Sequence, residues 1–125
     1  MRRFFQVLAV AAIVPTAVYA TRCVRHQQAR AVALPIVAEL GGRVGSITAP
    51  FGGTEYYISF AGCSLSRENI DRLAVLNALA RNWNYVSVSL NDASISSEDR
   101  EYMQQKLPEV HMLPIKSGAS VKPAA

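Results

Sequence analysis

The sequence is poor in the residues from which catalytic and metal sites are usually built. Its 125 residues include two cysteines, Cys23 and Cys63, and two histidines, His26 and His111. No CxxC motif occurs, and neither histidine stands in a ligand-like pattern with the cysteines. The stretch PFGGTE (50–55) lacks the GK[ST] end with which a phosphate-binding loop contacts its ligand. We therefore expect no catalytic residue, no metal site and no cofactor, and we expect that the protein is not an enzyme.

Acidic residues are absent from the first thirty positions, which contain five arginines. The rest of the chain holds eight basic and nine acidic residues, so the net charge of +4 comes from the N-terminal region. A nearly neutral remainder lacks the basic surface that nucleic-acid binding usually needs, and we expect no nucleic-acid partner. Basic residues beside an apolar segment are instead typical of a chain that meets phospholipid head groups.

An apolar run follows the basic start of the chain. Residues 4–20, with Gln6 and Pro15 inside, are a short candidate for a membrane-spanning helix, which needs about 20 residues. We expect a single-pass anchor in the cell membrane through this segment. The alternative is a signal peptide cleaved after Ala20, because AVYA (17–20) fits a small-residue cleavage site, and the product would then be secreted or periplasmic. Both flanks are similarly basic, so the positive-inside rule favours neither orientation.

The remainder reads as one small α/β domain. We divide the chain into a transmembrane anchor or signal segment (1–24), a basic juxtamembrane helix (25–42), a folded domain (43–115) and a disordered tail (116–125). Apolar spacing predicts helices at 29–40, 67–80 and 97–107, and alternation predicts strands at 43–47, 56–60, 85–90 and 109–113. Pro35 is expected to kink the first of these helices or to begin a new turn.

Two segments thirty residues apart are similar. ISFAGCSLSRENIDRL (58–73) aligns with VSLNDASISSEDREYM (88–103), and we interpret each as a strand, a tight corner and a helix that stack on the neighbouring unit. The aligned pairs are Cys63 with Ala93 as small corner residues, Leu65 with Ile95 as plugs of the core, and Ser66 with Ser96 as helix N-caps.

These two segments resemble leucine-rich repeats of the bacterial kind. Those repeats read roughly L-x-L-[SG]-x-T-x-[IV]-[TS]-D-x-x-L, followed by an LPNL-like start that is similar to LPEVHML (107–113). LGGRVGSI (40–47), shortly after an apolar segment, resembles small membrane-anchored leucine-rich repeat proteins of planctomycete-type bacteria. The resemblance covers about residues 38–113. It implies a short leucine-rich-repeat-like strand–helix solenoid fragment with a small parallel sheet, preceded by an N-terminal apolar helix.

Two and a half units fall short of the three or so that a solenoid needs. The N-terminal helix and the strand at 43–47 must then cap the stack, or the chain must self-associate.

The outward face of the sheet is the candidate binding site. The residues expected to face the core are Tyr56, Ile58, Phe60, Val86, Val88 and Leu90, so their alternates face outward. That outward row is Tyr57, Ser59, Ser87, Ser89 and His111. In the resembled family the sheet face commonly binds proteins.

The function that follows is a non-enzymatic, membrane-anchored leucine-rich-repeat-like module that mediates contacts with an unknown protein partner at the cell envelope. The alternative is a secreted or periplasmic small structural α/β protein, released by cleavage near Ala20.

Overall fold

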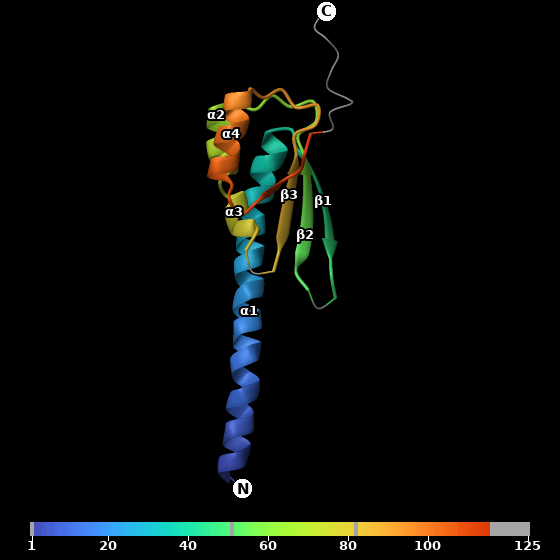
Figure 1. Cartoon of the computed structure of the whole chain (residues 1–125). Coiled ribbons are helices and arrows are strands. Elements are labelled where there is room, and N and C mark those ends of the chain that lie inside the picture. The colour runs from blue at the N-terminus through green and yellow to red at the C-terminus, as the bar shows by residue number, and fades with distance from the viewer. Residues whose placement is uncertain (1, 51, 82, 116–125) are drawn as a thin grey trace, which may run out of the picture.

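A long helix leads into a small two-layer head (Figure 1). The structure, a computed structural model, describes residues 2–50, 52–81 and 83–115. The elements are α1 (Arg2–Glu39), β1 (Arg43–Thr48), β2 (Thr54–Ser59), α2 (Arg67–Leu73), α3 (Leu76–Leu79), β3 (Tyr85–Ser89), α4 (Ser97–Lys106) and β4 (His111–Met112). The described helices lie on one face of a four-stranded sheet, and none of them covers the other face. The fold class is mixed α/β, as predicted, and the predicted tail (116–125) lies outside the described residues.

Helix α1 runs through both Pro15 and Pro35 without a break. The predicted boundary between 1–24 and 25–42 falls inside it, and no new helix begins at Pro35. Pro35 is exposed, so water can satisfy the carbonyl that it leaves without a donor. The described residues up to Thr21 are all exposed, whereas Ala33 and Val37 are fully buried in the head. One helix thus carries an exposed apolar end and a core-forming end.

Among the described residues, α1 is the one helix that is long and apolar enough to cross a membrane, or equally to serve as a signal sequence. The exposed end includes large apolar side chains such as Phe4, Phe5 and Ile13, each more than 60% exposed.

The sheet has the order β1-β2-β3-β4, and it is mixed rather than parallel. β2, β3 and β4 pair in parallel, as predicted, but β1 pairs with β2 as an antiparallel hairpin. The physical reason is the short connection between β1 and β2, because a parallel crossover needs a dozen or more residues. The stretch between the two strands contains Pro50, Gly52 and Gly53, residue types that are typical of turns.

The predicted repeat is visible in the pairing of β2 with β3. Each residue from Glu55 to Ser59 pairs with the residue thirty positions later, and an isolated bridge joins Ser64 to Ser94 in the same register. Both corners close in the same way. The N–H of Cys63 donates to the carbonyl of Phe60 at 2.9 Å, and the N–H of Ala93 donates to that of Leu90 at 3.1 Å.

The positive φ that this turn requires falls on equivalent residues, Gly62 (76°) and Asp92 (61°). Glycine adopts such a φ freely, and aspartate is among the residues that tolerate it.

The two predicted caps are confirmed. Ser66 Oγ accepts from the N–H of Asn69 at 3.3 Å, and Ser96 Oγ accepts from the N–H of Asp99 at 3.1 Å. Leu65 is buried (3% exposed), but Ile95 is buried only in part, because no third strand–corner–helix unit covers it among the described residues. The six inward-facing strand residues predicted above are all buried.

The helix predicted at 67–80 is instead two short helices, α2 and α3. Its fully buried residues recur every three positions, at Ile70, Leu73, Leu76 and Leu79. Winding at 3.6 residues per turn would rotate this row off the core, whereas 3₁₀-type bonds keep it on one face. Such bonds occur at the break, where the N–H of Asn77 donates to the carbonyl of Ala74.

Candidate functional site

The outer face of the sheet carries the five residues predicted as a binding surface. Strand register puts Tyr57, Ser87 and His111 in one row across β2, β3 and β4, and Ser59 beside Ser89 in the next row. Tyr57 and His111 are exposed, and Ser59 is half-buried. Ser87 and Ser89 lie on this face but are only 5% and 3% exposed.

The two serines are buried because β3 lies between β2 and β4 and their side chains are short. Ser87 Oγ donates to the carbonyl of Tyr56 at 3.4 Å, and Ser89 Oγ accepts from the N–H of Asn91 at 3.4 Å. Both hydroxyls therefore form hydrogen bonds with the protein's own backbone. A partner on this face would contact the larger side chains around them.

Two exposed residues on this face were missing from the predicted set. Tyr85 (46% exposed) lies beside His111, with ring centroids 5.8 Å apart, and Ile47 is 74% exposed on β1. The alternation of residues 85–90 already placed Tyr85 outward, so the sequence contained that signal. Ile47 depends on the antiparallel register of β1. We call Tyr57, Tyr85 and His111 the aromatic strip.

A second feature lies where α1 enters the head. Arg22 is the first described residue of α1 that is partly buried, and its guanidinium lies over the ring of Trp83, 4.1 Å from the centroid. Beside this pair is a cavity of about 230 Å³ between α1, the β1–β2 turn and the loop before β3. The side chains of α1 that line it are Tyr19, Arg22, Cys23, His26, Gln27 and Arg30.

The loop that carries Trp83 is held in place by its neighbours. Asn84 Oδ1 accepts from the N–H of Thr54 at 2.9 Å, and Asn84 Nδ2 donates to the carbonyl of Arg81 at 3.0 Å. Gly53 packs so closely on this loop that a Cβ there would lie 1.8 Å from the Trp83 carbonyl oxygen. Trp83 itself has a φ of 70°, which is unusual for a bulky residue and is sustained by these contacts.

His26 connects this cavity to the core. Its Nε2 lies 2.6 Å from Oη of the fully buried Tyr56. Burial, and then the nearby charge of Arg30, lower the pKa of His26 below its ordinary value. Burial raises the pKa of Tyr56. At neutral pH the pair is therefore uncharged, and the arginines supply the positive charge of the cavity.

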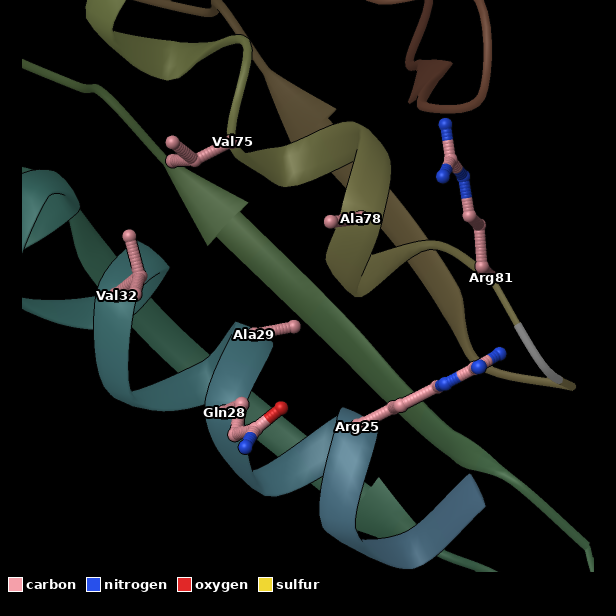
Figure 2. A pocket seen from close by; sticks show the side chains of 7 residues that line it. All are labelled: Arg25, Gln28, Ala29, Val32, Val75, Ala78 and Arg81. Carbon is pink, nitrogen blue, oxygen red and sulfur yellow. The ribbon is translucent and has the colours of Figure 1, made fainter. Parts of the chain in front are cut away.

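A groove of about 470 Å³ lies on another side of α1, between α1 and α3 (Figure 2). Ala29, Val32, Val75 and Ala78 form its apolar floor. Arg25 on α1 and Arg81, which follows α3, lie at the same end of the groove, and the Arg81 side chain points away from Arg25 (Figure 2). The described residues that line the cavity and the groove include four arginines and no carboxylate. We call Arg22, Arg25, Arg30 and Arg81 the basic collar.

The groups capable of acid–base chemistry are dispersed over the head. His26 contacts Tyr56, whose side chain faces the helices, whereas His111 lies with Tyr85 on the outer face of the sheet. No three His, Cys, Asp or Glu residues gather into a metal-binding group in the described part of the chain. Two features thus stand out on the described head: an aromatic strip on the sheet and a group of arginines around α1.

Comparisons with known proteins do not assign the chain to a family. A scan against protein-family models, a search of the curated proteins and a search of the solved structures each gave no match.

Proposed function

We propose that the protein is a non-enzymatic, single-pass membrane module that presents the aromatic strip to a protein partner at the cell envelope. The observation that carries the proposal is α1, a single helix whose apolar end is exposed and whose other end is part of the core. An exposed apolar surface of this extent is unfavourable in water and favourable in hydrocarbon. Because no break separates the two ends, the head would be held directly at the membrane surface.

The repeat supports a relation to short leucine-rich repeat proteins of the bacterial kind. Strand register, corner bonds and caps recur at an interval of thirty residues. In this interpretation α1 and β1 close one end of the stack, since α1 packs on α2 and α3 and β1 pairs with β2. At the other end, no described strand pairs with the outer edge of β4, so this edge can accept a further unit or a second copy of the chain.

The aromatic strip supports a protein partner. Tyrosine is enriched in protein interfaces because it combines a large apolar ring with a polar group. Tyr57 and Tyr85 are 48% and 46% exposed on a face that none of the described helices covers.

The anchor is tested by fractionation and intact-mass measurement. The full chain should stay with membranes after alkaline carbonate extraction, and its mass should include residues 4–20. A mature chain that begins at Thr21 would refute the anchor and support the alternative, a secreted or periplasmic structural protein.

The binding face is tested by a photo-crosslinking residue placed at Tyr57 in cells, with Glu101 on α4 as the matched exposed control. We expect a discrete adduct from position 57 and none from position 101. An adduct at twice the chain's mass would identify the partner as a second copy. Equal adducts at both positions, or none at 57, would contradict the proposal for this face.

A further inference from the structure

One end of the head carries the arginines of the basic collar, whereas at the other end basic and acidic residues are mixed, and Arg67 and Arg72 pair there with Asp99 and Glu39. The basic collar surrounds α1 at the end where its exposed apolar part emerges. Most of the acids lie toward the other end of the head: Glu39 at the end of α1, Glu68 and Asp71 on α2, and Glu98, Asp99 and Glu101 on α4. In Figure 1, α2 and α4 lie away from the protruding part of α1. The positive end of the head therefore faces the proposed membrane.

Helix geometry puts part of the collar at the depth of lipid head groups. Residues 4–20 span about 25 Å of helix, somewhat less than the roughly 30 Å hydrocarbon core. Arg22 and Arg25 follow Ala20 by about 3 Å and 7 Å along the axis. The interfacial layer on each side of the core is of similar thickness, roughly 5–7 Å. A segment that is slightly too short draws the underside of the head toward this layer.

Aromatic residues occur at the same level. Tyr19 and Trp83 both line the cavity beside Arg22, and Trp83 is 67% exposed although it is large and apolar. Trp and Tyr are enriched where membranes meet water, because their rings are amphipathic. The contacts of Asn84 and Gly53 hold the Trp83 backbone in an unfavourable φ, and so keep its indole directed outward beneath Arg22.

We propose that the basic collar and Trp83 form a binding surface for anionic phospholipid head groups of the bilayer that α1 crosses. The inference rests on the proposed anchor and adds a lipid specificity to it. Arg22 and Arg30 line the cavity, Arg25 and Arg81 line the groove, and neither set of described lining residues includes a carboxylate. Phosphate oxygens would supply the negative partners that these guanidinium groups bind strongly. A bilayer supplies such oxygens at the required depth, and its surface potential attracts each arginine.

Trp83 is the only tryptophan in the sequence, so its fluorescence reports on this surface alone. The full chain is reconstituted in neutral phosphatidylcholine vesicles. A fixed share of the lipid is then replaced by brominated phosphatidylcholine or by brominated phosphatidylglycerol, both of which quench tryptophan on contact. The ratio of anionic to neutral quenching measures local enrichment of the anionic lipid. We expect a ratio of several-fold at low salt.

The variant Arg25→Gln/Arg81→Gln removes two collar charges without touching the Arg22–Trp83 pair. The attraction of one arginine to an anionic membrane surface is worth about a fivefold preference for anionic over neutral lipid. The loss of two arginines should therefore remove most of the enrichment of anionic lipid around Trp83. Arg67→Gln/Arg72→Gln, two exposed arginines on α2, makes the same change in net charge away from the collar and should keep the ratio.

The outcomes separate this inference from the anchor. A chain that leaves neutral vesicles under carbonate refutes the anchor. A chain that stays inserted with a ratio near one leaves the anchor intact and overturns the lipid surface. An equal loss in both double variants also overturns it, because net charge alone would then explain the enrichment. Loss of enrichment in millimolar inorganic phosphate, but not in chloride of the same ionic strength, would assign the site to free phosphate instead.

Discussion

Leu65→Ala and Ile95→Ala change equivalent positions in the two units, but we expect unequal costs. Leu65 is 3% exposed and lies between the two units, whereas Ile95 is only partly buried at the end of the stack. Truncation of a buried leucine to alanine costs about 2–5 kcal/mol, and we expect about 3 kcal/mol for Leu65. For Ile95 we expect about 1 kcal/mol, because part of its surface is already in water.

These costs are large for a head of this size. A domain of roughly 80 residues has a free energy of unfolding of about 4–12 kcal/mol. With a urea dependence of about 1.5 kcal/mol per M, Leu65→Ala should lower the unfolding midpoint by about 2 M and Ile95→Ala by less than 1 M. The assay is urea unfolding of the full chain in detergent micelles, followed by Trp83 fluorescence.

Equal shifts in the two variants would refute the reasoning, because they would mean that Ile95 is covered as fully as Leu65. The expected cover would then be a second copy of the chain, and dilution of the protein should restore the inequality.

Three further predictions concern a helix cap, the buried Nε of an arginine and a histidine. Ser66→Ala should lower the free energy of unfolding by about 1 kcal/mol, because it removes the N-cap of α2. The control Ser97→Ala, on the exposed surface, should change the free energy of unfolding little. Equal effects of the two variants in urea unfolding would contradict the role of Ser66 as a cap. Arg100→Met should raise the free energy of unfolding by about 1 kcal/mol, since Arg100 Nε is buried and has no hydrogen-bond partner among the described residues. A lower urea midpoint would contradict this. The pKa of His26 is lowered in the folded state, so the unfolded state takes up a proton first, and the free energy of unfolding should fall as the pH drops below about 6.5. Urea midpoints at pH 7.5 and 5.8 should show that fall in the wild type and much less of it in His26→Asn, and an identical fall in both would contradict the assignment.

Much of the fold could be predicted because local patterns carry it. Alternation located β2 and β3, Ser66 and Ser96 marked two helix starts, and the interval of thirty residues set the register between the units. The errors arose where one pattern had two physical solutions. The apolar residues in 67–80 fit either one helix or two shorter, tighter helices. The strand at 43–48 is followed by a short turn, so it pairs antiparallel with β2 even though β2, β3 and β4 pair in parallel.

The sequence by itself determined the apolar and basic character of the N-terminal region, the elements of the head and the rows that face the core, because all of these follow from backbone periodicity and composition. Only the tertiary structure decided which outward-facing residues are exposed, since exposure depends on the size of the side chains around them. Ser87 and Ser89 are buried, whereas Tyr85 is exposed. Only the tertiary structure brought Trp83 to Arg22 and placed Arg25 and Arg81 along one groove, because chain folding joins segments that no local pattern relates.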